Sequence, residues 1–162
     1  MEIRIRPAML SDLKAVAQVE ALCFPPAEAA AEETFLTRLQ TYPESFLIAE
    51  KDAAVIGFIN GCVTNEKTIS DEMFEQAGRH DPAGDYQSIF GLDVIPEYRH
   101  QGLATILMRH MIEHARVKGR KGLILTCKDS LIGFYESFGY RNMGVSASVH
   151  GGAVWYDMIL EF

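Results

Sequence analysis

The most suggestive chemistry in the sequence lies in the stretch EYRHQGLATILMRHMIEHA, where a basic turn with one glycine opens into a helical pattern. The first turn of a helix leaves backbone N–H groups without intrahelical partners, and the helix dipole makes that end positive. Gly102 would let a ligand approach this backbone closely, while Arg99 and the small Ala104 suit an anion. These residues predict a pyrophosphate cradle. Glycine is common at such turns, however, and the sequence contains neither GxGxxG nor GxxxxGK[ST].

The charge distribution fits an anionic ligand at this turn. The net charge of −7 argues against general nucleic-acid binding. From Tyr98 to Lys121 there are six Lys/Arg residues and a single acid, Glu113, so this segment carries +5 and the remainder −12. An acidic body with one basic segment suits a polyanion at the basic end and a cationic ligand elsewhere. Alternatively, the four cations between Arg116 and Lys121 simply complement a helix C-terminus, which leaves Arg99 unexplained.

The elements that must position this turn are those of one α/β domain over residues 1–162. The apolar run SIFGLDVI before the turn predicts a central strand, with a bulge at its glycine. The polar stretch 65–86 ahead of it has the length of a functional loop or lid. The other expected elements are strands at 2–6, 46–50, 54–64, 122–127, 140–149 and 153–161, and helices from Ser11-Asp12 and at 27–40, 101–118 and 130–139.

Composition excludes several classes of protein. The chain is 48% hydrophobic over 162 residues, enough for one core, but its apolar runs are too short to span a membrane. The N-terminus MEIRIRP lacks the apolar segment of a signal peptide. Three cysteines without a CxxC pair predict buried thiols at Cys62 and Cys127, no disulfide and no zinc site. We therefore expect a cytoplasmic protein without a metal, a nucleic-acid partner or a membrane partner.

Two motifs make the chain resemble the GNAT superfamily of acetyl-CoA-dependent N-acyltransferases. VIPEYRHQGLA is similar to the superfamily's pyrophosphate loop, Q/R-x-x-G-x-G/A, and DSLIGFYESFGY is similar to its F-Y-E-x-x-G-[FY] helix, about 30 residues later. The resemblance implies a GNAT fold, with a mixed, mostly antiparallel sheet of six to seven strands and flanking helices. RPAMLSDLKAVAQVEALCFPP, DEMFEQAGRHDPAG and the C-terminal third resemble the arylalkylamine (serotonin-type) N-acetyltransferases and their bacterial relatives, which implies an amine acceptor.

The resemblance also implies acetyl-CoA as co-substrate and places the residues that would bind it. Backbone groups of Leu92, Asp93 and Val94 would face the pantetheine and the thioester, and a bulge there would free one amide to polarise the thioester carbonyl. The pyrophosphate would be held by Arg99, His100, Gln101, Gly102, Leu103, Ala104 and Thr105. The other side of the cofactor would be lined by Asp129, Ser130 and Phe134.

Acetyl transfer to an amine needs a base for the ammonium proton and an acid for the leaving thiolate. Tyr135 matches the family's general-acid tyrosine. Serotonin-type enzymes carry two histidines where this chain has Ser88 and Phe90, and the histidines of the chain fall elsewhere, at 80, 100, 110, 114 and 150. Glu28 resembles a catalytic glutamate of the insect branch of the family. The resemblance therefore implies Glu28 as the base that takes the ammonium proton, or Ser88 acting through a water molecule. Equally, Glu28 is a first-turn glutamate that stabilises a helix N-terminus.

The expected acceptor pocket contains Glu28 and Ser88 and is made partly apolar by Phe24, Pro25, Phe35 and Phe90. It favours a small arylalkylamine- or polyamine-like primary amine. We expect direct attack in a ternary complex, because no cysteine falls at a motif position suited to an acyl-enzyme. The alternatives are a peptide or protein N-terminal acetyltransferase and a non-catalytic CoA-sensing module. A homodimer through the C-terminal strands has no sequence signal behind it.

Overall fold

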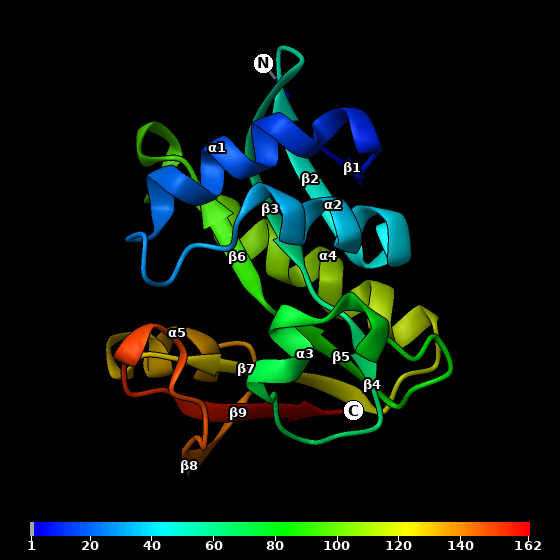
Figure 1. Ribbon diagram of the computed structural model, residues 1–162, viewed down its shortest axis with the longest axis vertical. Helices are drawn as coiled ribbons and strands as arrows, with labels where there is room; N and C mark the ends of the chain where they lie inside the picture. The colour runs from blue at the N-terminus through cyan, green and yellow to red at the C-terminus, as the bar shows by residue number, and fades with distance from the viewer. Residues whose placement is uncertain (1) are drawn as a thin grey trace.

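A computed structural model describes residues 2–162 and places the strands of this region in two sheets (Figure 1). The first sheet is antiparallel throughout, and the second is antiparallel except where β5 and β7 run parallel. In spatial order the first sheet contains β1 (Arg4–Pro7), β2 (Phe46–Lys51), β3 (Ala54–Asn60) and β6 (Gly91–Val94). The second contains β4 (Val63–Thr64), β5 (Tyr86–Ile89), β7 (Gly122–Cys127), β9 (Tyr156–Glu161) and β8 (Arg141–Val145).

The α/β class and the mostly antiparallel pairing are confirmed, but the predicted single sheet of six to seven strands is two sheets. Two of the predicted strands are each interrupted, and the two breaks lie side by side in the fold. The strand predicted over 54–64 breaks at Gly61, and the central strand breaks at Phe90. Gly61 is required there, because a Cβ atom on it would lie 1.8 Å from the carbonyl oxygen of Ser88. The two breaks divide one long sheet into two shorter ones.

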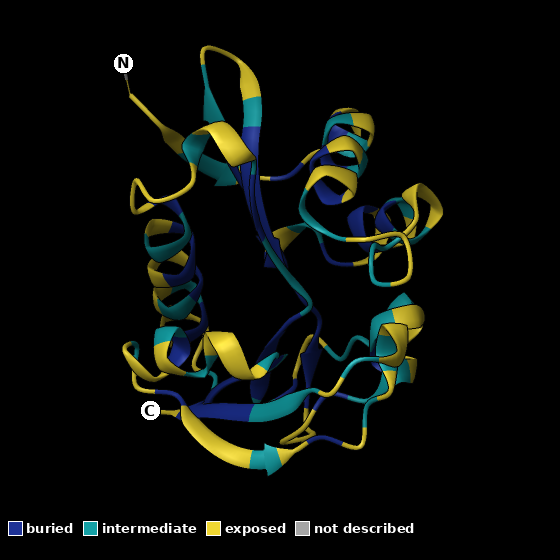
Figure 2. Cartoon of the chain, turned by 90° about the vertical axis from the view of Figure 1, so that its left-hand side faces the viewer, coloured by how far each residue is buried: buried dark blue, intermediate teal, exposed yellow. Residues whose placement is uncertain are grey.

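Five helices lie around the sheets of the described region: α1 (Leu13–Cys23), α2 (Glu32–Thr41), α3 (Asp71–Glu75), α4 (Leu103–Val117) and α5 (Ile132–Glu136). Strand alternation decides which helix covers which face of the first sheet. Ile48 and Phe58 pack with α1 and α2, whereas their neighbours Leu47 and Ile59 pack with α4. The first sheet is therefore covered on both faces, and the buried residues follow its strands and the inward faces of these helices (Figure 2).

Three segments lie near the candidate site, and the first and last of them differ from the sequence prediction. The helix expected from residue 27 begins at Glu32, because residues 25–31 form turns held by backbone bonds such as that from Glu28 N to Pro25 O, at 2.9 Å. The polar stretch 65–86 contains α3 and the short 3₁₀ turn Ala77–Arg79. The two last strands are shorter than expected, because residues 146–155 form a loop that contains the turn His150–Gly152.

Candidate active site

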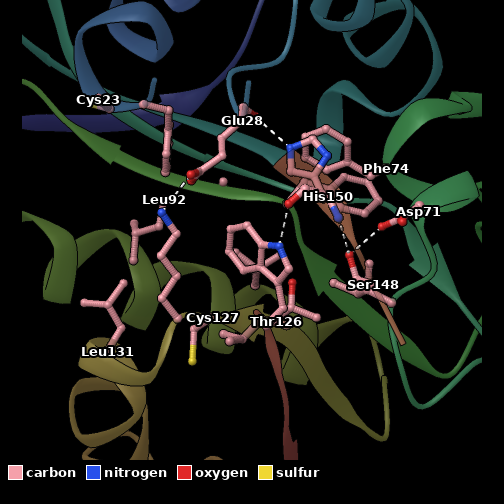
Figure 3. Close-up of a pocket in the computed structure, with 18 of the residues that line it drawn as sticks. Cys23, Glu28, Asp71, Phe74, Leu92, Thr126, Cys127, Leu131, Ser148 and His150 are labelled. Carbon is pink, nitrogen blue, oxygen red and sulfur yellow. Dashed lines mark hydrogen bonds and ion pairs between the residues drawn. The ribbon is translucent and has the colours of Figure 1, made fainter. Parts of the chain in front are cut away.

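A cavity of about 290 Å³ opens where β6 and β7 diverge (Figure 3). β5 pairs in parallel with β7 as far as Ile89 and Leu125; beyond this point β6 follows β3, and the end of β7 follows β9. In the described part of the chain the facing edges of β6 and β7 pair with no strand. Backbone groups of Gly91–Leu92 and Thr126–Cys127 border the cavity, and those on the facing edges are available to hydrogen-bond a ligand. An extended ligand that carries amides fits such a slot.

One end of the cavity is formed by Tyr135 on α5. Its ring is buried and packs edge-on against Phe134 and Tyr140, with ring centroids 5.1 and 5.9 Å away. Burial raises the pKa of the Tyr135 phenol, and the nearby Cys127 and Asp93 add to the rise. The phenol therefore stays protonated at neutral and moderately alkaline pH and is available as a hydrogen-bond and proton donor.

Glu28 lies in the wall opposite, and its charge is already partnered. Lys128 Nζ lies 2.8 Å from Glu28 Oε2, while Glu28 Oε1 is buried without a partner among residues 2–162. The Glu28 side chain is 9% exposed and that of Lys128 is 43% exposed. The Lys128 ammonium also lies 5.7 Å from the centre of the Trp155 ring. Glu28 thus presents one free acceptor oxygen beside a neutralising cation.

The third wall of the pocket joins segments that are far apart in the sequence. Asp71 accepts hydrogen bonds from the Ser148 hydroxyl and, at 3.2 Å, from the Val149 amide. The His150 ring lies 4.4 Å from the Phe74 ring, and its Nε2 donates to the carbonyl oxygen of Glu28 at 2.8 Å (Figure 3). The 65–86 stretch and the 146–155 loop are therefore tied together beside the pocket, with Asp71, Phe74, Ser148, His150 and Trp155 facing it.

This wall depends on a glycine at position 151. Gly151 has a φ of 62°, and a Cβ atom on it would lie 2.6 Å from Glu28 Cγ. Only glycine combines that backbone conformation with so close an approach. The turn is therefore fitted against the Glu28 side chain.

The predicted pyrophosphate turn follows β6 after the short 3₁₀ turn Pro96–Tyr98. Gly102 has a φ of 81° and precedes α4, and His100 also has a positive φ, of 63°. The first backbone hydrogen bond of α4 runs from the N–H of Ile106 to the carbonyl oxygen of Gly102, at 3.0 Å. Leu103, Ala104 and Thr105 therefore form the first turn of the helix, where N–H groups have no intrahelical partner. Arg99 Nε donates to the carbonyl oxygen of Val94 at 3.0 Å, which fixes the turn to the end of β6. A ligand that follows the free edge of β6 would reach these N–H groups.

The cations at the other end of α4 serve the fold. Arg120 Nη1 donates to the carbonyl oxygens of Pro82 and Gly84, both at 2.9 Å, and Lys121 lies 3.4 Å from Asp85. These contacts hold the segment that precedes β5. Arg99 is therefore the cation of the basic segment that lies at the predicted anion site.

The structure brings together part of the predicted site. Six of its residues line the pocket, namely Phe24, Pro25, Glu28, Phe90, Leu92 and Tyr135. Two predicted acceptor-site residues lie elsewhere: Ser88 is fully buried with its hydroxyl bonded to the carbonyl oxygen of Cys62 at 2.9 Å, and Phe35 packs in the core against Phe46 and Phe58. Asp93 is buried behind the pocket wall. Outside the pocket, Asp129 and Ser130 are exposed and Phe134 is half-buried at the start of α5.

Several pocket residues were missed by sequence reasoning. His150 was expected to fall away from the site but lines the pocket, because the 146–155 loop folds back over it. Other residues that line the pocket were not predicted as site residues, although they lie in segments noted for their family resemblance: Glu20, Asp71, Lys128, Ser148 and Trp155. Lys128 also directly precedes the second motif.

The diverging strands, the glycine turn before α4 and the tyrosine at the end of the pocket define the class of α/β domains that the two motifs implied. The chain belongs to the Acetyltransferase (GNAT) family, whose sequence pattern matches residues 13–140. Across residues 2–162, none of the helices has the length and apolar character needed to cross a bilayer. The same residues hold no group of three or more His, Cys, Asp or Glu side chains arranged to bind a metal ion.

Among curated proteins the chain is similar to serotonin N-acetyltransferase of Mesocricetus auratus, with 25% identity over 117 residues, 72% of this chain and 55% of the relative. It is also similar to N-acetyltransferase 8 of Homo sapiens, with 27% identity over 104 residues, 62% of this chain and 40% of the relative. The chain thus spans about half the length of the curated relatives it matches.

Solved structures share the fold across the whole chain. The GphF GNAT-like decarboxylase in complex with isobutyryl-CoA superposes with a TM-score of 0.83 at 22% identity, over 98% of each chain. PaiA N-acetyltransferase from Thermoplasma acidophilum, in complex with coenzyme A, superposes with a TM-score of 0.75 at 17% identity, over 100% of each chain. At these identities the likeness establishes the fold.

Proposed function

We propose that the protein transfers the acetyl group of acetyl-CoA to the primary amine of a small molecule, by direct attack in a ternary complex. The observation that carries the proposal is the pocket itself: it lies at the divergence of β6 and β7, ends at Tyr135 and has acidic side chains in its walls. The family supplies the reaction class, and the walls suggest the kind of acceptor.

The acyl donor would lie along the free edge of β6. Backbone groups of Leu92, Asp93 and Val94 would bond the pantetheine amides, and one of them would polarise the thioester carbonyl, an effect worth about 3 kcal/mol when the donor is preorganised. The N–H groups from His100 to Thr105, with Arg99, would hold the pyrophosphate. Asp129, Ser130 and Phe134 would border the other side of the cofactor.

The acceptor side suits a cationic amine with an apolar body. Glu20, Glu28 and Asp71 give the pocket more negative charge than Lys128 offsets. Phe24, Phe74, Phe90 and Trp155 supply apolar and aromatic surface. Because Asp71 ties the 65–86 stretch to the 146–155 loop, the wall favours a small molecule over a peptide that would extend beyond the pocket.

Direct attack is favoured over an acyl-enzyme. Cys127 lines the pocket, but burial raises the pKa of its thiol to about 11, so it is a poor nucleophile at neutral pH. Tyr135 would donate a proton to the leaving thiolate. Glu28, through its free oxygen, would bind the incoming ammonium.

The test is an acceptor panel with acetyl-CoA, with release of free thiol as the readout. Tryptamine, phenethylamine and spermidine represent the proposed class, and short peptides with free N-termini represent the alternative. Thiol release with the amines is the expected result. Release only with peptides would replace the small-amine proposal, and tight CoA binding without release would reduce the protein to a CoA-sensing module.

A further inference from the structure

A buried polar cluster lies behind one wall of the pocket, where α1, α2, β3 and β6 meet. Glu20 on α1 lines the pocket, and Asp93 on β6 lies behind it with only 1% of its surface exposed. Asn60 on β3 is fully buried, and Arg38 on α2 is buried between the rings of Phe74 and Phe90, whose centres lie 4.7 and 4.8 Å from its Cζ atom. Polar side chains at such depth destabilise a protein unless their atoms are paired.

Some atoms of the cluster are paired and others are not. Arg38 Nη1 donates to Asn60 Oδ1 at 3.0 Å, which fixes the Asn60 amide with its Nδ2 turned away from the arginine. Glu20 Oε2 accepts from the Ala30 amide at 2.8 Å. Among residues 2–162, the atoms of this cluster without a partner are Arg38 Nε, Asn60 Nδ2, Glu20 Oε1 and both carboxyl oxygens of Asp93.

Three of these unpaired atoms lie around the space beside Gly91 that a side chain would enter. A Cβ atom on residue 91 would lie 3.1 Å from Asp93 Oδ1, 3.4 Å from Asn60 Nδ2 and 3.8 Å from Glu20 Oε1. Because residue 91 is a glycine, no side chain fills this space, and Gly91 and Glu20 both line the pocket. One amide donor and two carboxyl acceptors match a water molecule, which has a further lone pair to offer to a ligand in the pocket.

We propose that Glu20 and Asp93 together accept the proton of the incoming ammonium, through a water molecule bound in this space beside Gly91. The inference rests on the proposed function, in which the amine enters protonated. One N–H bond of the ammonium breaks, and its electron pair remains on nitrogen. The proton passes to the water as the water releases another proton to a carboxylate oxygen of the pair. The pair thus gains one proton, and the neutral amine attacks the thioester carbonyl.

The charges around the pair fit this role. Burial, and then the neighbouring Glu20, raise the pKa of Asp93 well above its usual range, so a proton that reaches Asp93 is held more tightly than by an isolated carboxylate. Cys23 on α1 adds to the rise, Arg38 on α2 opposes it, and Tyr135 on α5 lies close enough to respond to the Asp93 charge. Glu28 is a weaker candidate, because Lys128 already neutralises it.

The experiment compares Glu20→Gln and Asp93→Asn with the unaltered protein across pH, using the fastest acceptor among tryptamine, phenethylamine and spermidine. An amine with a lysine-like pKa of about 10.4 is neutral in only about one molecule in 2,500 at pH 7, which sets the largest loss that removal of the base can cause. We expect kcat/KM to fall about 100-fold or more at pH 7 and to come within about threefold of the unaltered protein at pH 10.5. The affinity for CoA should not change.

A second variant tests the water without touching the carboxyls. Gly91→Ala places a methyl group in the space beside residue 91, which excludes the water, and should cause the same pH-dependent loss. Glu113→Gln, on the exposed side of α4, and Gly78→Ala, whose Cβ would meet no atom within 4 Å, are the matched controls.

Four outcomes would overturn the inference. Full activity of Glu20→Gln or Asp93→Asn at pH 7 would exclude the pair, and a loss that is equal at all pH values would make its role structural. Full activity of Gly91→Ala would exclude the water. If the unaltered protein releases thiol with none of the three amines, the proposed function fails first and the inference fails with it.

Discussion

Replacing Tyr135 by phenylalanine removes one oxygen atom from the end of the pocket and leaves the packing intact. The ring keeps its edge-on contacts with Phe134 and Tyr140, so we expect the melting temperature to change little. If the phenol donates to the departing sulfur, the variant loses a hydrogen bond to an anion, worth about 1.5–3 kcal/mol. At about 1.4 kcal/mol per tenfold change in rate, kcat should fall about 10- to 150-fold.

The assay is thiol release from acetyl-CoA with a saturating amine, accompanied by calorimetric titration with CoA. Because the pKa of Tyr135 is raised by burial, the phenol stays protonated, and the unaltered protein should lose no activity from this group up to about pH 10. CoA affinity should be nearly unchanged in the variant. An unchanged kcat would remove Tyr135 from the chemistry, and an equal loss of kcat and CoA affinity would assign it to binding.

Four further substitutions test other parts of the account. Gly102→Val forces a branched side chain into a left-handed backbone conformation, which costs about 1–2 kcal/mol for a non-glycine residue. Calorimetry should therefore show acetyl-CoA binding at least about tenfold more weakly. Normal affinity would contradict the predicted pyrophosphate site. Asp93→Asn should raise the melting temperature, and by more at pH 8 than at pH 4. The folded-state pKa of Asp93 lies above its unfolded value, so the protonated carboxyl stabilises the fold at low pH and this contribution is lost as pH rises. Asparagine stays neutral at both pH values, so the variant avoids that loss. A gain that is independent of pH would mean that Asp93 is not protonated in the fold. Glu28→Gln should raise KM for the amine about tenfold, because it removes a carboxylate that accepts from the ammonium. Lys128→Met should lower KM, because it frees the Glu28 carboxylate from its ion pair. A shifted pH–rate profile in Glu28→Gln would instead make Glu28 the base.

The half of the site that would hold the cofactor could be predicted because its residues are nearly contiguous. The turn from Arg99 to Thr105 is local, and its positive-φ glycine and helix start follow from short-range rules. Tyr135 belongs to a second local motif. For such segments the sequence contains the backbone conformation and the functional groups together.

The acceptor half could not be predicted because it is assembled from segments that meet only in the fold. Glu28, Asp71 and His150 lie far apart in the sequence. Hydrogen bonds join the 146–155 loop to Asp71 at the start of α3 and to the backbone of Glu28. Ser88 was assigned to the pocket from its position in the family pattern. In the structure the hydroxyl of Ser88 turns toward Cys62, and the strand breaks two residues later.

Sequence reasoning missed the proposed base, the pair Glu20 and Asp93, for a related reason. The family resemblance implied only a backbone role for Asp93, as for Leu92 and Val94. Strand alternation directs the Asp93 side chain to the face opposite Leu92, which lines the pocket. Its partners come from α1, α2 and β3, and no sequence spacing relates them to β6. The space they share exists because residue 91 lacks a side chain, which the sequence suggested only as a bulge.

The most direct test of the central claim is a crystal structure of the protein with CoA. We predict that the pantetheine lies between β6 and β7 with its sulfur beside Tyr135, and that the pyrophosphate contacts the N–H groups from His100 to Thr105. A nucleotide bound elsewhere, or a pantetheine that leaves the gap between β6 and β7 unused, would contradict the account.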